Sequence, residues 1–131
     1  MIDRKSAQPV WKSHEKTSAE KEAWLRPFEK DENLQMMDEE ALERARRYTE
    51  ELCREDNVFA LRLKGYACYG GNRLYECDWT AARDCMLRLR ELADDAEYAN
   101  TLGYIYYYGR CNGGEPEYEK AFPQFSYAAA N

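Results

Sequence analysis

The sequence predicts an all-α fold built as a helical-hairpin solenoid, an α/α superhelix of about six helices. Helix-capping residues precede segments whose apolar residues recur at helical spacing. The later part of the chain repeats itself with an offset of 38 to 39 residues, the length of one helix-turn-helix unit. No segment alternates apolar and polar residues between turn signals, so we expect no strands.

Residues 1–16 are polar and are expected to form an N-terminal arm. Trp11 is its one large apolar residue and the natural anchor for such an arm.

Residues 17–56 predict a first, degenerate hairpin. Thr17 and Glu20 have the spacing of a capping box, so a helix begins at residue 18 and ends or kinks at Pro27. Asp38 is the N-cap of a second helix that continues to about residue 53. Its apolar stripe consists of Leu42, Ala45, Thr49 and Leu52.

The remaining chain predicts two further hairpins, residues 57–93 and 94–131. Asn57 and Asp78 cap the helices of the first of these, and Gly70-Gly71 ends its first helix. Ala60, Leu63, Ala67, Ala81, Ala82, Cys85, Met86 and Leu89 are expected to face inward. In the last hairpin, Asp94 or Asp95 caps a helix that Gly109 ends, and the final helix begins at about Glu117.

The two hairpins align residue by residue. Placing Gly65 on Gly103 also places Gly71 on Gly109 and Met86 on Phe125. Because Gly103 has no Cβ, we expect the neighbouring helix to approach it closely, with Tyr106 and Phe125 filling the space between. One hairpin cannot cover its own apolar face, so neighbouring hairpins stack.

The last hairpin carries the pattern Leu102-Gly103-x-x-Tyr106-x-x-Gly109, then Glu117-Tyr118-Glu119-Lys120-Ala121-x-x-x-Phe125-x-x-Ala128-Ala129. This pattern resembles the Sel1-like repeat, a relative of the tetratricopeptide repeat. The preceding hairpin is similar to it but has Cys68 where the family has Tyr and Ala81 where it has Lys. The resemblance implies two Sel1-like repeats, with the degenerate first hairpin as a cap. The open C-terminal hairpin suggests either coverage by a second copy or a longer chain.

Charge and hydropathy narrow the class of partner. The net charge of −6 disfavours nucleic acid and anionic membrane surfaces. No apolar run approaches the roughly 20 residues needed to span a bilayer. The first residues lack the apolar region of a secretory signal, so a cytoplasmic protein is expected.

The sequence predicts neither catalysis nor a bound metal or cofactor. The five cysteines include no C-x2-C pair, and the only histidine, His14, lies in the arm. The cysteines are expected to be reduced thiols between helices. Carboxylate pairs at helix starts are better explained by capping, and no phosphate-binding Lys-Ser/Thr follows Gly113-Gly114.

Tyrosine is the informative residue, because ten of the 11 tyrosines follow residue 57. The first helices of the two repeats place similar residues on one face, which such solenoids usually turn toward the concave side. The candidate protein-binding residues are Arg62, Tyr66, Tyr69, Asn100, Tyr104 and Tyr107, with Tyr108 at the edge. Tyr and Arg concentrate binding energy in interfaces. The alternative is that several of these tyrosines pack against the neighbouring repeat.

The leading functional prediction is an interaction module, such as an adaptor, inhibitor or assembly factor, that binds a protein or peptide. A second hypothesis is a small-molecule-binding or enzyme-like protein, since the resemblance extends to cysteine-rich Sel1-like proteins linked to β-lactam binding. Their cysteine pairing does not match the placement of Cys77, Cys85 and Cys111. A third hypothesis is self-association through the C-terminal hairpin.

Overall fold

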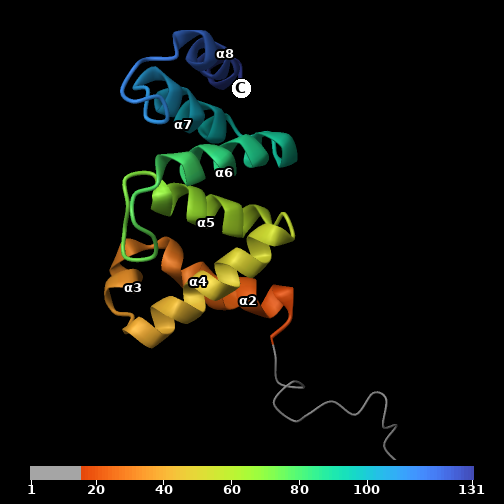
Figure 1. Cartoon of the computed structure of the whole chain (residues 1–131). Helices are drawn as coiled ribbons and strands as arrows, with labels where there is room; N and C mark the ends of the chain where they lie inside the picture. The colour runs from red at the N-terminus through yellow and green to blue at the C-terminus, as the bar shows by residue number, and fades with distance from the viewer. Residues whose placement is uncertain (1–15) are drawn as a thin grey trace, which may run out of the picture.

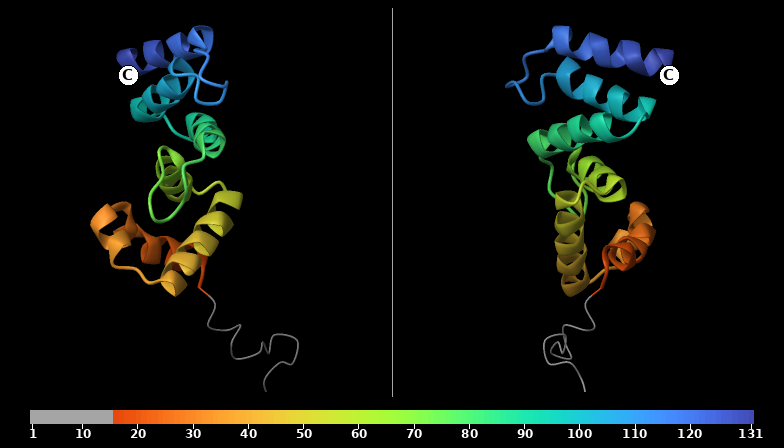
Figure 2. Two further views of the ribbon diagram at one scale, coloured as in Figure 1. Left: turned by 60° about the vertical axis from the view of Figure 1, so that its left-hand side comes forward. Right: turned by 90° about the vertical axis from the view of Figure 1, so that its right-hand side faces the viewer.

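The computed structural model describes residues 16–131, which are helical and contain no strand, as the sequence predicted. The helices follow one another in chain order along a row, from the N-terminal helices at one end to α8 at the other (Figure 1). Two further views show the same elongated arrangement (Figure 2). The expected arm, including Trp11, lies outside the described residues apart from Lys16.

The N-terminal part consists of α2 (Ser18–Leu25), the 3-10 helix η1 (Arg26–Glu29), α3 (Asp31–Gln35) and α4 (Glu39–Arg54). The capping box is formed, because the Thr17 amide donates to the Glu20 carboxylate at 2.8 Å and the Glu20 amide donates to the Thr17 hydroxyl at 3.2 Å. Asp38 caps α4 as expected. The sequence did not predict α3, a five-residue helix without a side-chain cap.

The two following hairpins are α5 (Val58–Cys68) with α6 (Trp79–Leu92), and α7 (Ala96–Tyr107) with α8 (Tyr118–Ala130). Asn57, Asp78 and Asp95 each accept a hydrogen bond from an amide in the first turn of the helix that follows. This result selects Asp95 over Asp94 as the cap of α7. Both connecting loops lie on the same side of the row (Figure 1).

The internal repeat is visible in the helix contacts. A Cβ added to Gly65 would lie 2.7 Å from the terminal methyl carbon of Met86, and one added to Gly103 would lie 2.6 Å from the ring of Phe125. The expected close approach at Gly103 is therefore confirmed, and the equivalent glycine makes the equivalent contact.

The connecting loops repeat as well. The Asp78 amide donates to the Cys68 carbonyl at 3.0 Å, and the Glu117 amide donates to the Tyr106 carbonyl at 2.9 Å. Each bond joins the start of a second helix to the end of the first helix of its hairpin. Both hairpins are thus closed by the same backbone geometry.

The core lies between successive helices. The predicted α4 stripe is buried throughout, and so are the inward positions of α5 and α6 except Ala81, which is partly exposed. Leu102 and Ile105 of α7 are fully buried. Within residues 16–131, none of the helices combines the length and the apolar character needed to cross a membrane.

Candidate interaction surface

Exposed aromatic side chains gather on the α7–α8 hairpin. We define the aromatic cluster as Tyr104, Tyr107, Tyr108, Tyr118 and Phe122, whose side chains are 41%, 37%, 51%, 46% and 58% exposed. The first three are predicted binding residues, and the last two were not predicted. A contiguous exposed apolar surface is uncommon on a soluble protein and marks sites of interaction.

Ring contacts join the cluster into one surface. The rings of Tyr104 and Tyr108 stack with centroids 6.1 Å apart, and those of Tyr118 and Phe122 stack at 5.8 Å. Tyr107 links the two pairs, at 5.1 Å from Tyr108 and 5.3 Å from Tyr118. Phe125 lies beneath, 5.0 Å from Tyr104. These contacts hold the rings in place, so partner binding would require little further ordering.

Tyr69 is connected to this cluster across the boundary between the hairpins. Its ring meets Trp79 edge-on at 5.1 Å. The guanidinium of Arg110 lies 4.6 Å from the centroid of the Trp79 ring and 5.4 Å from that of Tyr108. Arg110 is exposed, so a cation bridges the half-buried rings of α5–α6 and the exposed rings of α7–α8.

Arg62 and Tyr66 line a separate cavity of about 370 Å³ between α5, η1 and the start of α7. Arg62 is committed to an ion pair with Glu29 at 2.8 Å. The Tyr66 hydroxyl oxygen is buried and has no hydrogen-bond partner among the described residues. Burial, with the nearby Glu97 carboxylate, raises the pKa of Tyr66, so this side chain is a neutral phenol at physiological pH.

Asn100 is exposed and borders a shallow hollow with Glu97, Phe125 and Ala128. The seven predicted residues therefore fall into three places: the cluster and its extension through Tyr69, the cavity at Arg62 and Tyr66, and the hollow at Asn100. The structure brings Tyr104, Tyr107 and Tyr108 together directly. Tyr118 and Phe122 could have been noticed from their spacing of four residues, which puts two aromatic side chains on one face of a helix.

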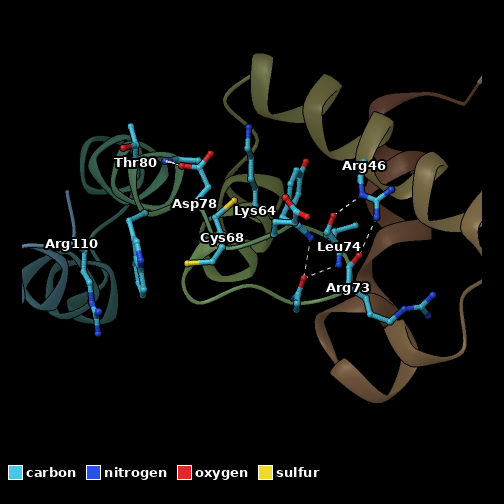
Figure 3. Close-up of a pocket in the computed structure, with 14 residues that line it drawn as sticks. Arg46, Lys64, Cys68, Arg73, Leu74, Asp78, Thr80 and Arg110 are labelled. Carbon is cyan, nitrogen blue, oxygen red and sulfur yellow. Dashed lines mark hydrogen bonds between the residues drawn. The ribbon is translucent and has the colours of Figure 1, made fainter. Parts of the chain in front are cut away.

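A cavity of about 820 Å³ follows the loop between α5 and α6 (Figure 3). Its cations are already engaged. Arg46 donates to the carbonyls of Leu74 and Arg73 at 2.7 and 3.1 Å, and Lys64 pairs with Glu50 at 2.8 Å. Arg46 and Arg110 lie at opposite ends of this view (Figure 3). Because these cationic side chains already pair with the loop or with Glu50, few charged groups of the cavity lining remain available to bind a ligand.

The cysteines are unpaired thiols. Burial raises the pKa of Cys53 and of Cys85 to about 12, and that of Cys68 to about 11. Thiols with such pKa values are protonated at neutral pH and are poor nucleophiles and metal ligands. Among residues 16–131, no three His, Cys, Asp or Glu side chains are arranged to hold a metal ion.

No protein-family model, curated protein or solved structure matches the chain. The resemblance to Sel1-like repeats therefore rests on the residues of the last two hairpins and stays a prediction.

Proposed function

We propose that this protein is an interaction module that binds another protein or a peptide through the aromatic cluster of α7–α8. The observation that carries this proposal is the exposure of five adjoining aromatic side chains, each between 37% and 58% accessible. Exposing so much aromatic surface is unfavourable in water, and a bound partner would remove it from solvent.

The polar ends of the tyrosines support a protein partner. The hydroxyls of Tyr104, Tyr107, Tyr108 and Tyr118 make no hydrogen bond to any other described residue, whereas that of Tyr127 donates to Asp94 at 3.2 Å. A tyrosine at an interface contributes apolar area from its ring and a hydrogen bond from its hydroxyl. Four hydroxyls without a partner in the described part of the chain, each beside its own ring, suit a partner surface that combines apolar side chains with backbone polar groups.

We further propose that the two C-terminal hairpins are Sel1-like repeats, which would place the protein among the α/α solenoids that commonly serve as adaptors, inhibitors or assembly factors. The equivalent glycine contacts and the equivalent loop hydrogen bonds support a repeated unit. The interaction proposal itself does not depend on this relationship.

The experiment that tests the proposal compares affinity capture from native lysate by the wild type and by a Tyr104→Ala/Tyr107→Ala variant. Both side chains are partly exposed, so the variant should keep the helical circular dichroism spectrum of the wild type. We expect a protein that is retained by the wild type and reduced about tenfold or more with the variant. Tyrosine is enriched among the few interface residues that dominate binding energy, and a combined loss of about 1.4 kcal/mol lowers affinity tenfold.

A matched control replaces exposed apolar residues away from the cluster. Met36 and Leu92 are 86% and 37% exposed, and a Met36→Ala/Leu92→Ala variant removes comparable apolar side chains from other helix ends. It should retain the same protein as the wild type. Equal loss with both variants, or retention by the folded tyrosine variant, would show that the cluster is not the binding surface.

A further inference from the structure

The cavity of about 370 Å³ beside Tyr66 is built from segments that are far apart in the sequence. Its walls come from η1, from one side of α5 and from the start of α7. The volume lies within the range of about 300–1,000 Å³ that is usual for small-ligand sites. The cavity shares no residue with the aromatic cluster, so a ligand bound here would be separate from the proposed protein-binding surface.

The charges of the cavity lining are unbalanced. The lining includes three carboxylates, those of Glu29, Asp95 and Glu97, and one cation, Arg62. Arg62 pairs with Glu29 at 2.8 Å. Within the described residues, the side chains of Asp95 and Glu97 form no ion pair, and their one hydrogen bond is that which Asp95 accepts from the Glu97 amide at 2.8 Å. The α7 side of the cavity therefore carries two negative charges that no described cation neutralises.

Helix capping explains Asp95, but it does not explain the hydroxyl of Tyr66. The oxygen of this hydroxyl is buried and forms no hydrogen bond with any described residue. Such orphaned groups are uncommon in folded proteins, because burying them without a partner is unfavourable. Burial raises the pKa of Tyr66, so the side chain is a neutral phenol whose oxygen can accept from an N–H group. The nearby Glu97 side chain is exposed and unpaired, so it can turn to admit a donor that bonds both oxygens.

The remainder of the lining is apolar and aromatic. Leu63 and Ala67 of α5 are 8% and 1% exposed. Phe28 and Tyr66 supply two aromatic side chains, both partly buried. Aromatic rings attract cations to their faces, and buried aliphatic side chains suit the stem of a long cationic side chain. The lining therefore combines negative charge with apolar surface.

We infer that this cavity binds an alkyl guanidinium group, such as the end of an arginine side chain. The carboxylates of Asp95 and Glu97 supply the opposite charge, and the Tyr66 oxygen accepts one N–H group. A guanidinium is planar, stacks on aromatic rings and has five N–H donors in a fixed arrangement. An ammonium is more strongly hydrated, so it loses more on leaving water. The guanidinium can belong to a peptide or to a free alkylguanidine, and the chemistry of recognition is the same.

The test is nuclear magnetic resonance titration of the ¹⁵N-labelled full chain with two probes, N-acetyl-arginine methylamide and n-butylguanidine. Each probe is compared with its uncharged urea analogue, N-acetyl-citrulline methylamide or n-butylurea. The guanidinium probes should shift residues 62–67 and 95–98 and should bind at least about tenfold more tightly than their analogues. Binding should weaken as salt is added, because salt screens the attraction between exposed charges. Tighter binding of the arginine derivative would identify a peptide as the source, and equal binding a free alkylguanidine.

Two variants test the assigned groups. Glu97→Gln keeps the size of the side chain, removes one charge and should raise the dissociation constant of both guanidinium probes at least about fivefold. Tyr66→Phe removes only the orphaned hydroxyl, so it should keep the melting temperature of the wild type and weaken binding at least about threefold. The matched control is Glu40→Gln, since Glu40 is likewise exposed and in the first turn of its helix. This control should bind the probes like the wild type.

Three results would overturn the inference: no binding of either guanidinium probe, equal binding of the urea analogues, or unchanged binding by the folded Glu97→Gln variant. Shifts confined to residues 104–108 would also overturn it, because the cation would then bind the aromatic cluster. The inference does not depend on the proposed function. The Tyr104→Ala/Tyr107→Ala variant should bind both probes like the wild type, whether or not it still captures a protein.

Discussion

The hairpins α5–α6 and α7–α8 have the same internal contacts and different surfaces. Tyr69 and Trp79 form a ring pair at 5.1 Å, and the equivalent residues Tyr107 and Tyr118 form one at 5.3 Å. In α5–α6 both rings are half-buried, with Arg110 against Trp79. In α7–α8 the equivalent rings are exposed. An aromatic pair near the loop is therefore common to both hairpins, and the exposure of its rings distinguishes α7–α8 from α5–α6.

Three rings have no exposed aromatic equivalent in α5–α6. Phe122 corresponds to Arg83, Tyr108 to Gly70, and exposed Tyr104 to half-buried Tyr66. These are the residues that enlarge the scaffold pair into the aromatic cluster. Residues that the repeats share therefore report on folding, whereas residues in which they differ indicate where to look for function.

The largest expected effect concerns the glycine that ends α7. Gly109 has φ of +60°, and an added Cβ would overlap the backbone of Glu115. Gly109→Ala should lower the free energy of unfolding by about 3 kcal/mol, from left-handed backbone strain and overlap together. Gly113→Ala is the control, since Gly113 has φ of +63° but nothing within 4 Å of the added Cβ. Gly113→Ala should lower the free energy of unfolding by about 1 kcal/mol. If urea unfolding shows equal losses of stability for the two variants, the close approach of Gly109 to the Glu115 backbone is contradicted.

The next effect tests how each loop is held. Each loop has a backbone hydrogen bond of its own, from the Asn72 amide to the Tyr75 carbonyl and from the Gly114 amide to the Gly109 carbonyl, both at 2.9 Å. The α5–α6 loop is in addition held by Arg46 of α4, which donates to two of its carbonyls. Arg46→Ala should therefore destabilise the protein by about 2 kcal/mol. Arg110→Ala removes an exposed cation that contacts the rings of Trp79 and Tyr108, and should destabilise the protein by no more than about 1 kcal/mol. Thermal melting of both variants measures the two losses of stability. A larger loss for Arg110→Ala than for Arg46→Ala would contradict this prediction.

A smaller effect separates the two helix contacts. An added Cβ at Gly103 meets the rigid ring of Phe125 at 2.6 Å. One at Gly65 meets the flexible end of Met86 at 2.7 Å and, less closely, the Cβ of Cys85 at 3.1 Å. Alanine adds up to about 1 kcal/mol of helix stability at either position. Gly103→Ala should still destabilise by about 1 kcal/mol because of overpacking, and Gly65→Ala should be close to neutral. Chemical unfolding of the two variants compares them, and a stable Gly103→Ala protein would mean that Phe125 moves freely.

Local signals in the sequence predicted most of the fold. Thr17, Asp38, Asn57, Asp78 and Asp95 all cap helices, because a cap depends on residues within one turn. The short helix α3 was not predicted, because it has no side-chain cap and its five residues are too few to show a helical apolar repeat. Its single buried residue, Leu34, belongs to a core that also includes residues of α2, α4 and α5.

The surface was harder to predict than the fold. The shared spacing of Arg62, Tyr66 and Tyr69 and of Asn100, Tyr104 and Tyr107 suggested one continuous strip. In the structure, the contact between Arg62 and Glu29, a residue 33 positions earlier, commits this arginine to the N-terminal helices. Whether a side chain is exposed depends on such distant partners, which helical periodicity does not report.

The measurement that tests the central claim most directly is nuclear magnetic resonance mapping of the ¹⁵N-labelled full chain, titrated with the protein that wild type captures. If the interaction belongs to the surface that distinguishes α7–α8, backbone shifts will concentrate at residues 104–108 and 118–122. The half-buried equivalents in α5–α6, at residues 66–70 and 79–83, will remain unchanged. Shifts concentrated in α5–α6 or in the N-terminal helices, with none at residues 104–108, would contradict the account.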